Sequence, residues 1–145
     1  MSLLVAQGTA TIFILIALVH LYWALGGRLG SEAAIPHVAG AAPGQLQPAF
    51  RPTAWITALV ALGLLLIALL VCLRAGLYLP LLSQPWLRWL ISAMALLMFA
   101  RAIGDSNLVG FFKEPSPSRF ARLDTLVYSP LCVALGAGLL VVAWN

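Results

Sequence analysis

The stretch AWITALVALGLLLIALLVCL, residues 54–73, contains no charged side chain. An α-helix rises about 1.5 Å per residue, so a helix of this length spans the roughly 30 Å hydrocarbon core of a bilayer. Three further, mainly apolar stretches of similar length occupy residues 3–25, 86–104 and 123–144. We therefore predict an all-α integral membrane bundle of four transmembrane helices, which forms a single domain over residues 1–145 and has a long first loop.

The overall composition agrees with a membrane protein. Hydrophobic residues make up 63% of the chain and charged residues only 8%, with a mean hydropathy of +1.04. Soluble domains carry about a quarter charged residues, so this composition excludes an ordinary soluble domain. The net charge of +4 is better explained by anionic lipid than by nucleic acid, which we do not expect as a partner.

The first loop, residues 26–53, carries four prolines and several glycines. Such a composition favours neither a regular helix nor a strand. Long loops without regular structure are often functional, and this one keeps Ile35, Val38, Leu46 and Phe50. We expect it to fold over the membrane face as a lid.

The placement of lysine and arginine predicts the orientation. The first and third loops share one side and hold five basic residues, whereas the second loop and its flanks hold two: Arg28, Arg51, Lys113, Arg119 and Arg122 against Arg74 and Arg88. Because cytoplasmic loops are enriched in basic residues, we predict that loops one and three are cytoplasmic and that both termini are outside. The expected location is the bacterial cytoplasmic (inner) membrane.

An arginine and an aspartate interrupt the third apolar stretch near its end, in FARAIGDSNLVGFFK, residues 99–113. Arg101 and Asp105 are four residues apart, so a helix places them on one face. Charges near hydrocarbon are costly, and pairing lowers that cost. One interpretation is a self-neutralising ion pair at a helix end, and the other is that the two charges line an internal polar pocket.

Other polar side chains fall at the same end of the bundle, which favours the pocket. His20 lies a few residues before the Gly26–Gly27 break, Asp124 and Tyr128 lie near the start of the fourth stretch, and Arg51 precedes the second. For His20, hydrogen bonding between helices stays open beside acid/base chemistry or substrate binding. We expect no cofactor and no metal, because metal-ligand spacing such as HxxxH is missing. The candidate catalytic residues are His20, Asp105, Asp124 and Tyr128, and the candidate ligand-binding residues are Arg101, Lys113, Trp23 and Arg51.

Three blocks of sequence, VHLYWALGG, RAIGDSNLVGFFK and FARLDTLVYSPLC, resemble a family of small bacterial four-helix membrane proteins of unknown function. The resemblance covers nearly the whole chain. It implies a four-helix integral membrane fold, and it implies no reaction.

Two functions are compatible with these features. The first is a membrane enzyme that uses acid/base chemistry on a lipid-like or isoprenoid-like substrate. The second is a non-catalytic lipid-binding protein or accessory membrane subunit. A transporter is least favoured, because four helices form a narrow pathway and the polar residues crowd one end. The expected partner is a membrane lipid or hydrophobic small molecule, and a homo-oligomer stays open.

Overall fold

The computed structural model describes residues 2–78, 84–105 and 107–145. Four of its helical segments are long and apolar enough to cross a membrane: Leu3–Ala24, Ala54–Ala75, Pro85–Ile103 and Arg119–Trp144. These segments confirm the predicted membrane helices, and the ends differ from the prediction by a few residues at most. The chain is thus a helical protein with the character of a multi-pass membrane protein.

The first three segments are single helices, α1 (Ser2–Ala24), α3 (Ala54–Ala75) and α4 (Pro85–Ile103). Local signals fix their ends. Thr53 caps the start of α3 by accepting a hydrogen bond from the Ile56 N–H, and Gly76 ends this helix in the left-handed conformation, φ 66°. Pro85 occupies the first turn of α4, where a missing N–H costs nothing.

The fourth segment is a run of three helical pieces, α5 (Arg119–Leu123), η1 (Asp124–Tyr128) and α6 (Ser129–Trp144). The middle piece is a π-helical turn in which the Ser129 N–H donates to the Asp124 carbonyl. Pro130 follows directly and has no N–H to continue the ordinary ladder. The wide turn therefore sits where the helix changes its hydrogen-bond register.

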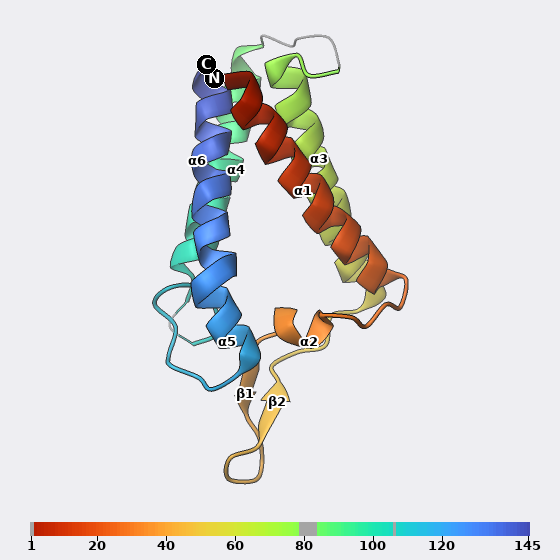
Figure 1. Cartoon of the computed structure of the whole chain (residues 1–145), viewed down its shortest axis with the longest axis vertical. Coiled ribbons are helices and arrows are strands. Elements are labelled where there is room, and N and C mark those ends of the chain that lie inside the picture. The colour runs from red at the N-terminus through yellow and green to blue at the C-terminus, as the bar shows by residue number, and fades with distance from the viewer. Residues whose placement is uncertain (1, 79–83, 106) are drawn as a thin grey trace.

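The helices pack as two pairs, α1 with α3 and α4 with α6. On α1 the buried positions form one stripe of mostly small residues, which lets neighbouring helices approach closely: Ala6, Thr9, Ala10, Phe13 and Ala17. The two pairs meet near the chain termini and diverge toward the other end of the molecule (Figure 1). Gly138 of α6 lies against Thr9 of α1, where a Cβ would collide with the threonine hydroxyl.

Loops one and three lie at the end where the pairs diverge, opposite the termini (Figure 1). The first loop contains a short helix, α2 (Ser31–Ala34), and two antiparallel strands, β1 (His37–Ala39) and β2 (Leu46–Pro48). Our expectation of neither helix nor strand there was wrong. The strands are only three residues long, and Pro48 sits at the end of the last, where an edge strand tolerates proline.

Loop one reaches the fourth segment through α2. The Tyr128 hydroxyl donates to the Ala33 carbonyl at 3.0 Å, and α2 packs on α5. The hairpin of β1 and β2 projects away from the bundle (Figure 1). Two of the apolar residues expected to form a lid, Leu46 and Phe50, are exposed. Hence α2 joins the diverging ends of the two helix pairs.

Candidate functional site

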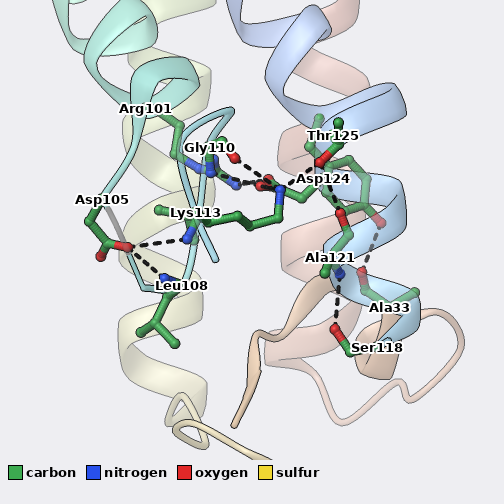
Figure 2. A network of polar contacts seen from close by, with 12 residues as sticks. Ala33, Arg101, Asp105, Leu108, Gly110, Lys113, Ser118, Ala121, Asp124 and Thr125 are labelled. Atoms are coloured by element: carbon green, nitrogen blue, oxygen red, sulfur yellow. Dashed lines mark hydrogen bonds and ion pairs between the residues drawn. The ribbon is translucent and has the colours of Figure 1, made fainter. Parts of the chain in front are cut away.

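Asp124 is the centre of a polar cluster in the described part of the chain. It is the first residue of the π-helical turn, and its side chain is 0% exposed. One carboxylate oxygen, Oδ1, accepts from Arg101 Nη2 at 2.7 Å. The other, Oδ2, accepts from the Gly110 N–H at 2.7 Å and lies 3.0 Å from Lys113 Nζ. Figure 2 shows these contacts converging from three segments. The buried carboxylate is therefore paired with two cations, as a buried charge must be.

Lys113 points inward. Its ammonium group donates to the Gly110 carbonyl at 2.9 Å and to Thr125 Oγ1 at 2.7 Å, in addition to its ion pair with Asp124. An ammonium group has three donors, and these three contacts use all of them. The side chain is only 6% exposed, so Lys113 ties loop three to the fourth segment.

Two glycines allow loop three to fold tightly onto the end of α4. Gly104 and Gly110 both have left-handed backbones, with φ of 74° and 88°. Their backbones lie very close together. A Cβ on Gly104 would collide with the backbone of Val109 and Gly110, and a Cβ on Gly110 with the backbone of Ile103 and Gly104. Hydrogen bonds close the loop, from the Phe111 N–H to the Ala102 carbonyl at 2.9 Å and from the Asp105 N–H to the Val109 carbonyl at 3.1 Å. Only glycine fits this geometry without strain.

Asp105 is exposed, and its side chain caps the turn that follows it. Its Oδ1 accepts from the backbone N–H groups of Leu108 at 2.6 Å, Asn107 at 2.9 Å and Val109 at 3.3 Å. These bonds, the one from Leu108 above all, hold the pKa of Asp105 below its ordinary value of 3.8. Of the two interpretations of Arg101 and Asp105, the self-neutralising ion pair does not match the structure, because Arg101 turns toward Asp124, 23 residues away in sequence.

The other candidates lie outside the Asp124 cluster. His20 Nδ1 is 2.8 Å from the Ile16 carbonyl, and its ring meets the Trp23 ring edge-on at 5.2 Å. Trp23 Nε1 donates to the Leu29 carbonyl, which fixes the start of loop one.

The remaining two candidates also have other surroundings. Arg51 is exposed, and the Tyr128 hydroxyl donates its hydrogen bond to the Ala33 carbonyl. Among the described residues, no hydrogen bond or ion pair joins His20, Asp105 or Tyr128 to the Asp124 carboxylate.

The structure thus brings together three of the candidates, Arg101, Lys113 and Asp124. Sequence reasoning missed Gly104, Gly110 and Thr125. The two glycines, which enclose residues 105–109 in the sequence, were a usable signal, since paired glycines around a short polar loop indicate a left-handed turn. Within the described ranges, no three His, Cys, Asp or Glu side chains gather as a metal site.

An open pocket of about 330 Å³ lies beside this cluster, at the end with loops one and three. Lys113 and Thr125 of the cluster line it, together with Phe111, Glu114 and Arg122. In the described chain both ion pairs end on Asp124, so neither Glu114 nor Arg122 takes part in one. The pocket therefore presents one carboxylate and one guanidinium, both exposed, to whatever enters it.

Four apolar helices and a buried ion cluster at one end define the class, a small helical membrane protein with a polar end. Residues 13–139 match the family described as protein of unknown function, DUF3995, and the chain belongs to that family. No curated protein and no solved structure matches the chain.

Proposed function

We propose that this protein binds a phospholipid-like amphiphile without changing it chemically, and that the pocket beside Lys113 takes the headgroup. The pocket lined by Glu114 and Arg122 is the observation that carries this proposal. Arg122 offers a guanidinium for a phosphate, and Glu114 offers a carboxylate for an ammonium. A zwitterionic headgroup with a primary amine, as in phosphatidylethanolamine, supplies both partners.

The position of the pocket relative to the membrane, at the level of the lipid headgroups, supports a lipid ligand. The fourth segment spans Arg119–Trp144, whereas about 20 helical residues cross the hydrocarbon core. With Trp144 at the far interface, the first turns of this segment extend into the headgroup layer. Arg122 belongs to these turns, and exposed Phe111 and Phe112 lie in the adjoining loop. In a segment that lies at the interface, apolar side chains such as Phe insert toward the acyl chains while the charged residues stay in the headgroup layer.

The contacts of Asp105, Asp124 and Tyr128 favour binding over the alternative in which these three side chains act as acids or bases. Asp124 is neutralised by two cations, and Lys113 has no unused donor. Tyr128 and Asp105 are engaged by backbone groups. A general acid or base needs a side chain within reach of the reacting atom. These candidates instead hold loops one and three in place.

Native mass spectrometry of the full chain in mixed-lipid nanodiscs tests the proposal. We expect the protein to retain phosphatidylethanolamine over phosphatidylcholine, whose methylated ammonium cannot donate hydrogen bonds. We expect Glu114→Gln to lose the preference for phosphatidylethanolamine, which is worth up to about fivefold in retention. Arg122→Gln should lower the retention of both lipids by up to about fivefold. Both figures correspond to the free energy of an exposed ion pair. Glu32→Gln and Arg28→Gln are matched controls, because both residues belong to loop one and lie outside the pocket lining.

Equal retention of the two lipids by the wild-type protein contradicts the proposal. So does a loss of preference in Glu32→Gln as large as in Glu114→Gln. Recovery of a chemically altered lipid after incubation favours the enzyme instead.

A further inference from the structure

The end of the molecule that carries the second loop has basic side chains and no acidic ones. All four acidic residues of the chain lie in or beside loops one and three: Glu32, Asp105, Glu114 and Asp124. At the opposite end, Arg74 lies in the last turn of α3 and Arg88 in the first turns of α4. No carboxylate side chain of the sequence is near enough to neutralise them.

Both arginines converge on the last residues of α6. Arg74 Nη2 donates to the Ala143 carbonyl at 3.1 Å. The Arg88 guanidinium carbon lies 5.1 Å from the centre of the Trp144 ring and 5.7 Å from that of Trp89. Ala143 and Trp144 are consecutive, so the two guanidinium groups flank the same helix end.

The aromatic side chains around Arg88 are held in fixed positions. The Trp89 and Trp144 rings pack edge to face at 5.3 Å, and Trp144 Nε1 donates to Ser92 Oγ at 3.1 Å. Ser92 in turn donates to the Arg88 carbonyl at 2.8 Å. Contact with the ring faces does not use the N–H donors of the Arg88 guanidinium as hydrogen bonds to an acceptor oxygen would.

Each arginine also has a buried donor for which the described residues offer no acceptor. The Nε atoms of Arg74 and Arg88 are shielded from solvent and have no hydrogen-bond partner among the described residues. A buried donor without a partner is costly, so the described residues leave both guanidinium groups under-satisfied. The partial negative charge at the end of α6 amounts to about half an elementary charge, and no ion pair of the described residues joins Arg74 or Arg88 to a carboxylate.

We propose that Arg74 and Arg88 bind the phosphate of an anionic phospholipid in the leaflet at the second-loop end. A phosphate offers several oxygens in the fork geometry that guanidinium groups prefer. Interfacial tryptophans place the site at headgroup depth. This site lies at the other end of the molecule from the Glu114 and Arg122 pocket, so each proposal fails or stands separately.

The test compares lipid-dependent stability in nanodiscs of phosphatidylcholine with and without phosphatidylglycerol. We expect phosphatidylglycerol to raise the melting temperature of the wild-type protein, and native mass spectrometry to show it retained over phosphatidylcholine. Arg88→Gln and Arg74→Gln each lower that retention about tenfold, in line with a lost charge-assisted hydrogen bond. Arg51→Gln, an exposed arginine at the other end, leaves it unchanged.

A purely structural role for the two arginines predicts a different result. In that case the glutamine variants melt earlier but gain as much from phosphatidylglycerol as the wild-type protein, and the proposal is overturned. Should a glutamine variant fail to fold, Arg88→Lys replaces it, because lysine keeps the positive charge and loses the paired N–H donors of the guanidinium. If this variant retains phosphatidylglycerol as well as wild type does, the proposal is also overturned. Stabilisation by inorganic phosphate alone, with none by phosphatidylglycerol, assigns the site to free phosphate and contradicts a lipid.

Discussion

At the scale of single residues, Asp124 and Asp105 show how differently two carboxylates act at one end of a bundle. Asp124 is fully buried and joins Arg101, Gly110 and Lys113. Asp105 is exposed and caps a turn. Their burial could not be deduced from the sequence. That of Asp124 depends on how the fourth segment is rotated, and that of Asp105 on how the chain turns after α4 ends at Ile103. Arg101 had two acidic partners within reach of α4, and the nearer in sequence was the wrong one.

Asp105 predicts a pH dependence of stability. Its pKa is lowered in the folded protein by the N–H groups of its turn, so the carboxylate form stabilises the fold. This stabilisation is fully present above the unfolded carboxyl pKa and disappears as the pH falls through the lower folded pKa. We expect the melting temperature of wild type to exceed that of Asp105→Asn by a constant margin near neutral pH. Below about pH 4 the margin narrows.

Melting curves of the two proteins in detergent between about pH 7 and pH 3 measure this margin. Glu114→Gln is the control, because Glu114 is exposed and makes no ion pair with another described residue. A margin that stays constant across the whole range shows that the charge of Asp105 does not stabilise the turn.

At the scale of elements, the sequence predicted the four membrane segments because long apolar runs have few alternatives in a bilayer. It did not predict the hairpin of β1 and β2, because strands of three residues are too short to show a periodic pattern. The π-helical turn also escaped prediction. Pro130 indicated an irregular helix, but neither the type of turn nor the burial of Asp124 at its start follows from one proline.

The crossing of Gly104 and Gly110 gives a prediction at this scale. Alanine at either position must relieve a collision with backbone and adopt a left-handed conformation. We expect Gly104→Ala and Gly110→Ala each to destabilise the protein by more than about 1 kcal/mol. Thermal unfolding in detergent measures the effect.

Gly63 provides the matched control for this prediction. It lies inside α3, and no atom lies within 4 Å of the position that a Cβ would take, so the added methyl group of Gly63→Ala meets open space. Alanine in a helix interior is favoured over glycine by about 0.5–1 kcal/mol, so this variant should melt no earlier than wild type. Losses of equal size at Gly63 and Gly104 would show that the crossing has no special role.

At the scale of the whole molecule, the two ends differ in charge. The end with loops one and three holds six basic and four acidic residues, and the other end holds only Arg74 and Arg88. Lysine and arginine counts predict orientation, so we expect loops one and three to face the cytoplasm. Reporter fusions after Asn145 and in the second loop should then report an external location. A cytoplasmic signal from both fusions reverses the orientation and means that the basic residues serve the polar cluster.

The ion pair between Arg101 and Asp124 connects α4 to the fourth segment and is the contact on which the polar end depends. A double-mutant cycle of Arg101→Gln, Asp124→Asn and the combined variant, followed by unfolding in detergent, tests it most directly. Asp124→Asn leaves two cations without their carboxylate and should cost about 3–5 kcal/mol. We predict that the combined variant loses less than the sum of the single losses, by at least about 1.5 kcal/mol. Losses that add to within about 0.5 kcal/mol would contradict the account, because the two residues would then act independently.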